Sequence, residues 1–129
     1  MLLQASAYAL HLLSGVMLLA VFFAIYTKVT PFDEVALIRQ GNAAAALSLG
    51  GAGIGFCLTI VSSIVHNDTL VMFLIWSVGA MVVQTGVYAI LTRVVPQMNP
   101  AIEANNVAMG GLMGAMSLMV GMINAASLS

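Results

Sequence analysis

Four long apolar runs divide the chain, and they limit its fold more than any other feature of the sequence. Each run has about 20 to 23 residues, which as α-helix spans about 30 to 35 Å and matches the hydrocarbon core of a bilayer. Because backbone amides in lipid must bond within their own segment, such runs predict helices, and the lack of alternation argues against a barrel. The runs are Ala5 to Tyr26, Ala43 to Val65, Thr69 to Leu91 and Val107 to Ala126.

Composition points the same way. Of the 129 residues, 62% are hydrophobic and 5% are charged, whereas a soluble domain has about 25% charged residues. We therefore expect an all-α integral membrane protein in a single domain, residues 1–129. The net charge of −1 gives no basic surface for nucleic acid, and the single cysteine, Cys57, excludes an internal disulfide. No basic residue precedes the first run, which predicts a retained span and not a cleaved signal peptide.

The basic residues predict the orientation. Lys28 and Arg39 lie in the first connection and Arg93 in the third, while the second connection, residues 66–68, has no lysine or arginine. By the positive-inside rule, the first and third connections face the cytoplasm. Both termini are then expected in the periplasm.

The two halves of the sequence resemble each other. A shift of 64 residues places Asn42 on Asn106 and Gly50 on Gly114. A unit with two spans returns to its starting side, so a duplication predicts two parallel two-helix repeats with short cytoplasmic interfacial segments. Chance similarity between glycine-rich helices is the alternative. The predicted repeats cover residues 1–65 and 69–129, approximately.

The first connection carries signals for a short helix. Thr30 can cap its start, Pro31 suits the first turn, and Asp33 can accept from free amides. Gly41 can end it in a left-handed conformation, and Asn42 can cap the second span. In the other half, Asn105 and Asn106 take the corresponding places. The segments are either re-entrant elbows at the inner surface or simply well-capped loops.

Small residues gather on the second and fourth spans, which each contain a G-x-x-x-G pattern. This pattern predicts close helix packing, with a backbone-lined pore as the alternative. Gln84, in the middle of the third span, is expected to point inward or to bridge subunits. Bulky side chains such as Phe22, Phe73 and Tyr88 are expected to face lipid or neighbouring subunits. The candidate pore or packing residues are Asn42, Gly50, Gly51, Gly55, Gln84, Asn106, Gly110 and Gly114.

Charged side chains gather near the predicted cytoplasmic face, where they form either a docking surface or a solvated connection with local ion pairs. No catalytic, cofactor-binding or metal-binding motif is present, so we expect no enzyme activity, no cofactor and no metal. A row of methionines on the fourth span could bind Cu(I), but membrane packing is favoured. The candidate docking residues are Lys28, Asp33, Glu34, Arg39, Arg93 and Glu103.

One stretch carries a family resemblance: Glu34-Val35-Ala36-Leu37-Ile38-Arg39-Gln40-Gly41-Asn42, followed by Ala44-Ala45-Ala46 and Gly50. It resembles the YjfL-like family of bacterial inner-membrane proteins (domain of unknown function 350). The resemblance covers nearly the whole chain and implies a bacterial inner-membrane location. It brings no established activity, and it implies an association with proteins related to membrane stress or polyamines. The second half departs from this pattern, with Glu103-Ala104-Asn105-Asn106 in place of Arg39-Gln40-Gly41-Asn42.

Two functions follow as hypotheses. In the first, the protein is a subunit of a small homo-oligomeric channel or transporter, with the candidate pore residues lining its path. In the second, it is a membrane scaffold that does not transport and that recruits a protein partner or membrane lipid at its cytoplasmic face.

Overall fold

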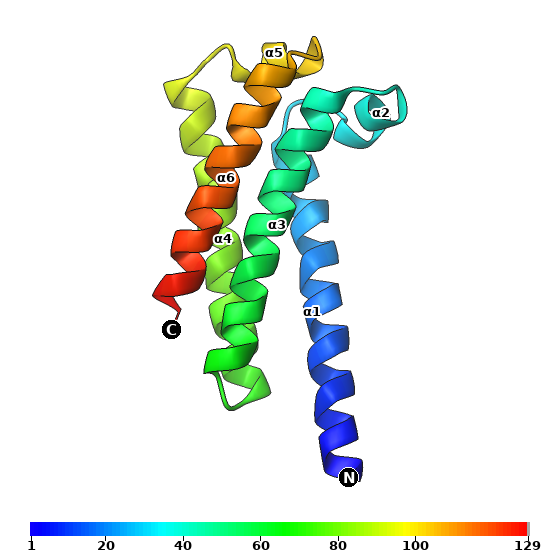
Figure 1. Ribbon diagram of the computed structural model, residues 1–129, viewed down its shortest axis with the longest axis vertical. Coiled ribbons are helices and arrows are strands. Elements are labelled where there is room, and N and C mark those ends of the chain that lie inside the picture. Colours follow the sequence, from blue (N-terminus) through cyan, green and yellow to red (C-terminus); the bar gives the residue numbers. More distant parts are fainter. Residues whose placement is uncertain (129) are drawn as a thin grey trace.

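The computed structural model describes residues 1–128 and shows an all-α protein, with no strand in this part of the chain, which confirms the predicted fold class (Figure 1). All four long helices are long and apolar enough to cross a membrane. Ser129, the last residue of the predicted second repeat, lies outside the described residues. The long helices are α1 (Leu2–Val29), α3 (Ala43–His66), α4 (Leu70–Val94) and α6 (Val107–Ser127), and the short helices are α2 (Glu34–Arg39) and α5 (Met98–Glu103).

All four long helices end beyond their predicted last residues, α3 and α6 by one residue and α1 and α4 by three. α1 begins at Leu2 and ends at Val29, and α4 ends at Val94, so the last turns include Lys28 and Arg93. A basic side chain is favourable near a helix C-terminus, and its long stem lets the charge reach water from a helical position. The predicted runs stopped at the first polar residues, which the helices in fact include.

The centre of the fold is the parallel pair of α3 and α6, which approach each other along their glycines. A Cβ atom on Gly51 would overlap the backbone of Gly114, and one on Gly110 would overlap the backbone of Ala44. Near the other end, Gly121 meets the backbone of Gly55. Small residues let two membrane helices gain dispersion contacts from backbone to backbone, which is the main attraction available to them in lipid.

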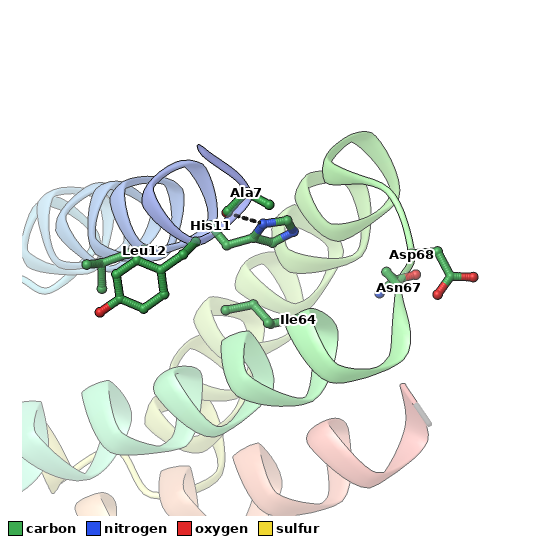
Figure 2. Close-up of a pocket in the computed structure, with 7 residues that line it drawn as sticks. Ala7, His11, Leu12, Ile64, Asn67 and Asp68 are labelled. Carbon is green, nitrogen blue, oxygen red and sulfur yellow. Dashed lines mark hydrogen bonds between the residues drawn. The ribbon is translucent and has the colours of Figure 1, made fainter. Parts of the chain in front are cut away.

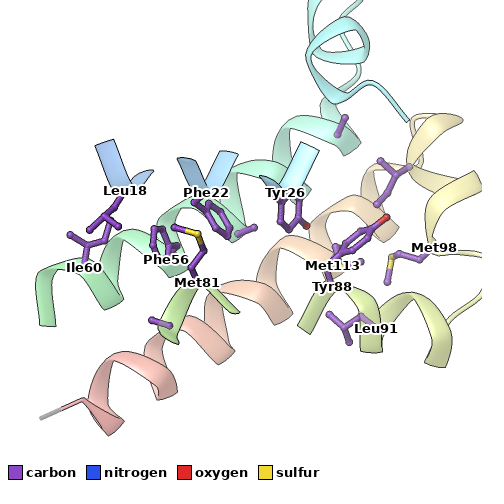
Figure 3. Close-up of a cluster of buried hydrophobic side chains, with 14 of the residues drawn as sticks. Leu18, Phe22, Tyr26, Phe56, Ile60, Met81, Tyr88, Leu91, Met98 and Met113 are labelled. Atoms are coloured by element: carbon purple, nitrogen blue, oxygen red, sulfur yellow. The ribbon is translucent and has the colours of Figure 1, made fainter. Parts of the chain in front are cut away.

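Aromatic side chains pack α1 and α4 against this pair. Phe22 stacks on Phe56 with ring centroids 4.6 Å apart, and Tyr26 meets Tyr88 edge-on at 5.3 Å (Figure 3). Phe22, Phe73 and Tyr88 are buried, so the prediction that they face lipid or neighbouring subunits is wrong. The small faces of α3 and α6 explain the difference, because two helices that touch through glycine leave hollows that large rings fill.

The two connecting segments have the same construction. Gly41 and Asn105 both have positive φ, and the side chains of Asn42 and Asn106 both cap the helix that follows, as predicted. Asp33, and not Thr30, caps α2, by accepting from the amide of Ala36. Both halves thus have the order long helix, short helix, long helix. Their origin by duplication stays a prediction that this order supports.

Candidate functional site

The glycines proposed for a pore or for packing fall into two groups. The α3–α6 contact takes up Gly51, Gly55, Gly110 and Gly114, each of which lies against backbone atoms of the opposite helix. Gly50 differs, because a Cβ atom added there would meet nothing within 4 Å. At these four glycines the two backbones touch and leave no room for a solute, and a groove of about 270 Å³ lies beside the contact, with Gly50, Gly51 and Gly114 in its lining.

Gln84 lies inside the bundle, where α4 faces α3 and α6, and is 1% exposed. Its amide nitrogen donates to the carbonyl oxygen of Ser117 at 2.8 Å. Its oxygen has no hydrogen-bond partner among the described residues. The hydroxyl of Ser77, seven residues earlier on the same face of α4, also has none there. An unpaired buried polar atom costs about 1–3 kcal/mol, so a polar partner at either group would be stabilising.

The hydroxyl of Tyr26, on α1, also has no hydrogen-bond partner among the described residues, whereas two other buried hydroxyls bond to carbonyl groups. Thr59 donates to Phe56 at 2.6 Å, and Ser63 donates to Phe73 at 3.0 Å. Ser77 was not predicted from the sequence, because an isolated serine in an apolar helix is usually bonded to its own backbone. Its spacing of seven residues from Gln84 was the available signal, since it places both side chains on one helix face.

Asn42 joins the two halves at the end of the bundle that carries α2 and α5. Its amide nitrogen donates to the carbonyl oxygens of Ile102 at 2.9 Å and Glu103 at 3.3 Å. Its side-chain oxygen accepts from the amide of Ala45 at 2.8 Å. In return, the side chain of Asn105 accepts from the amide of Ala44, which is a free amide in the first turn of α3. The two bonds from Asn42 to the carbonyl oxygens of Ile102 and Glu103, at the end of α5, are called the clasp.

Asn106 occupies the corresponding position in the second half but has a smaller role. Its side-chain oxygen accepts from the amide of Met109 at 3.2 Å, and the side chain is exposed. The two asparagines therefore share the capping role, but of these two side chains it is that of Asn42 that also bonds to the other half.

The candidate docking residues all lie at the α2–α5 end of the bundle (Figure 1). A groove of about 250 Å³ runs between the turns that follow the two short helices, and Gln40, Glu103 and Asn105 contribute to its lining. Glu34 does not belong to this surface, because it is 1% exposed and points into the protein, contrary to its expected place. The exposed members of the set are Lys28, Asp33, Arg39, Arg93 and Glu103.

The carboxylate of Glu34 lies between α2 and the bundle, close to Thr30, Tyr26 and Tyr88. The hydroxyl of Thr30 donates to it, and its charge acts on Tyr26 and Tyr88. Burial raises the pKa of Glu34 to about 7; the Thr30 bond opposes this rise and the charge of Asp33 adds to it. No basic side chain in the described chain is among the groups that act on this carboxylate. The group can therefore gain or lose a proton near neutral pH.

A pocket of about 510 Å³ lies at the opposite end between α1 and the turn from α3 to α4 (Figure 2). The ring of His11 bonds through Nδ1 to the carbonyl oxygen of Ala7 at 2.8 Å and faces Ile64 across the pocket (Figure 2). Asn67 and Asp68 lie at its rim. The described residues contain no group of three His, Cys, Asp or Glu side chains that could hold a metal ion.

Comparison with known proteins gives the family. The family model described as Domain of Unknown Function (DUF350) matches residues 1–128. The chain is 30% identical to the UPF0719 inner membrane protein YjfL of Escherichia coli (strain K12) over 123 residues, which are 95% of this chain and 93% of that protein. The same values hold for YjfL of Escherichia coli O157:H7. No solved structure matches. With its four apolar helices, the chain is a small multi-pass protein of the inner membrane, and it belongs to the DUF350 family.

Proposed function

We propose that the protein is a subunit of an oligomeric channel or transporter in which the inner face of α4 lines the path of a small polar solute or ion. The observation that carries this proposal is the pair of unpartnered buried groups, Ser77 and Gln84, on that face. Seven residues of helix separate them by about 10 Å along the bundle axis. Polar atoms that lack protein partners at this depth offer binding positions that lipid cannot fill.

The proposal includes more than one copy of the chain. In the most apolar stretch of α1, 6% of the residues are buried within the protein, so most of this helix is not covered by the rest of the chain. A neighbouring copy would cover the exposed apolar face of this helix. The path would run within each chain, between α4 and the α3–α6 pair, where Ser77 and Gln84 lie.

Gln84→Leu is the direct test. In vesicles that contain the purified protein, we expect the variant to lower flux about tenfold, which corresponds to losing one hydrogen-bond partner worth about 1.4 kcal/mol. The probes are potassium and protons, followed with entrapped dyes, and glycerol and urea, followed by osmotic swelling.

Thr85→Val is the matched control on the neighbouring residue. The hydroxyl of Thr85 donates to the carbonyl oxygen of Met81 at 2.9 Å and does not depend on the path. We expect its flux to equal that of the unmodified protein. If the unmodified protein moves none of the four probes faster than empty vesicles, or if Gln84→Leu moves them equally fast, the channel proposal is wrong.

A membrane scaffold is the second candidate, and the charged α2–α5 end favours it. Five exposed charged side chains and the polar groove lie on this one end. A peripheral protein or anionic lipid could bind there. The scaffold predicts no flux, together with loss of cross-linking to its partner when Arg39 and Glu103 are both changed to alanine.

The orientation has its own test. We propose that the α2–α5 end faces the cytoplasm, because Lys28, Arg39 and Arg93 all lie there. In a Cys57→Ser background, Lys28→Cys and Arg93→Cys should react with an impermeant thiol reagent in inside-out vesicles, and His66→Cys in intact spheroplasts. Reaction of Lys28→Cys and Arg93→Cys from opposite sides would contradict the orientation and the parallel repeats together.

A further inference from the structure

We propose that Glu34 is a proton-binding site that controls the docking of α2 on the bundle. The protonated side chain stays buried beneath α2, and the ionised side chain draws α2 away from the bundle into water. This inference concerns a site separate from Ser77 and Gln84 and holds for either a channel or a scaffold.

The surroundings of Glu34 favour its neutral form. The hydroxyl of Thr30 bonds to the carboxyl group, and the titratable groups that face it are Tyr26 from α1, Tyr88 from α4 and Asp33 at the start of α2. Tyrosine is uncharged near neutral pH and aspartate is negative, so none of these groups balances a negative charge. A buried carboxylate without a basic partner is unstable relative to the hydrated one.

The position of Glu34 lets this instability move a segment of the chain. Glu34 is the first residue of a six-residue helix that is joined to α1 by the turn containing Pro31. Phe32 and Leu37, on either side of it, pack against the hydrophobic core as partly buried side chains. If α2 lifts, the carboxylate reaches water, and these two side chains leave the core with it. The proton passes from the carboxylic acid to water, with no other reactant.

The direction of the pH dependence follows from linkage. The ordinary pKa of a glutamate is 4.5, and burial raises that of Glu34 to about 7. The docking of α2 is therefore most stable below pH 4.5, and the part of its stability that depends on protonated Glu34 is lost as the pH rises to 7. Over this interval the ratio of lifted to docked α2 should rise about tenfold per pH unit, and above it the ratio should level off.

Cysteine labelling measures this ratio. In a Cys57→Ser background, Leu37→Cys places a thiol on the half-buried side of α2, and Val35→Cys places one on its exposed side. At each pH the labelling rate at position 37 is divided by the rate at position 35, which removes the pH dependence of the thiol itself. We expect this quotient to rise between about pH 5 and pH 7 and to stay constant above.

Two variants make the result specific. Glu34→Gln has no proton to lose, so the quotient should stay low and constant with pH. Asp68→Asn removes an exposed carboxylate at the opposite end of the protein and should keep the pH dependence. A constant quotient in the unmodified background, or a pH-dependent one in Glu34→Gln, would overturn the proposal.

Infrared spectroscopy tests the site without relying on a variant of α2. The unmodified protein should show a carboxylic-acid C=O band that persists above the pH at which exposed carboxyl groups ionise and disappears near pH 7. Absence of this band would contradict the proposal even if Glu34→Gln failed to fold. At about pH 8, replacing choline in the buffer with sodium should leave the quotient unchanged. A decrease of the quotient that occurs with sodium and not with choline would identify a metal-cation site in place of a proton site.

Discussion

Gly51→Ala is expected to weaken the contact between α3 and α6, whereas Gly50→Ala, one residue earlier, is expected to leave it intact. At Gly51 the added Cβ atom would overlap the carbonyl oxygen, Cα and carbonyl carbon of Gly114, which are all backbone atoms and cannot rotate away. The two helices must separate, and they then lose dispersion contacts along their length. We expect a loss of about 3 kcal/mol in the free energy of unfolding.

The measurement is unfolding in mixed detergent micelles, followed by circular dichroism, on both variants and the unmodified protein. Gly50 is the matched control, because it is in the same helix and a Cβ atom there meets nothing within 4 Å. Its change to alanine should be neutral or stabilising, since alanine favours helix by up to about 1 kcal/mol. Equal stability of the two variants would show that the glycine contact does not hold α3 to α6.

The four spans and the caps could be predicted from the sequence because both depend on local properties. A run of about 20 apolar residues has few alternatives to a membrane helix. An asparagine after a residue that tolerates positive φ is a local signal for a helix start, and both Asn42 and Asn106 follow it. From the sequence, Gly50 and Gly51 were both predicted to be pore or packing residues. Only the rotation of α3 relative to α6 decides that Gly51 lies in the contact and that Gly50 lies outside it.

The environment of Glu34 could not be predicted in this way. A carboxylate in a charged connection between spans is normally exposed, and the sequence around it gives no contrary signal. Its burial arises because Phe32 and Leu37 anchor α2 on the core and because Tyr26 and Tyr88, from two distant segments, lie beneath it. Such contacts depend on tertiary packing, which the periodicity of a six-residue helix does not encode.

Asn42→Ala is expected to destabilise the protein by about 3 kcal/mol, and Asn106→Ala by about 1 kcal/mol. Each substitution removes one capping bond, to Ala45 or to Met109 respectively. The change at Asn42 also removes the clasp, in which a buried amide nitrogen donates to the carbonyl oxygens of Ile102 and Glu103. The same unfolding measurement compares the two variants, and equal losses would show that the clasp contributes nothing.

Asn42→Asp separates the clasp from the cap. Aspartate caps a helix as well as asparagine does, but its side chain cannot donate, and its charge would face the carbonyl oxygens of Ile102 and Glu103. We therefore expect Asn42→Asp to lose most of the stability that Asn42→Ala loses, while Asn106→Asp keeps its own. This contrast would follow from the difference between the halves: both asparagines start a helix, and the one in the first half also holds the end of α5. If Asn42→Asp were as stable as the unmodified protein, capping alone would account for the residue and the two halves would be equivalent at this position.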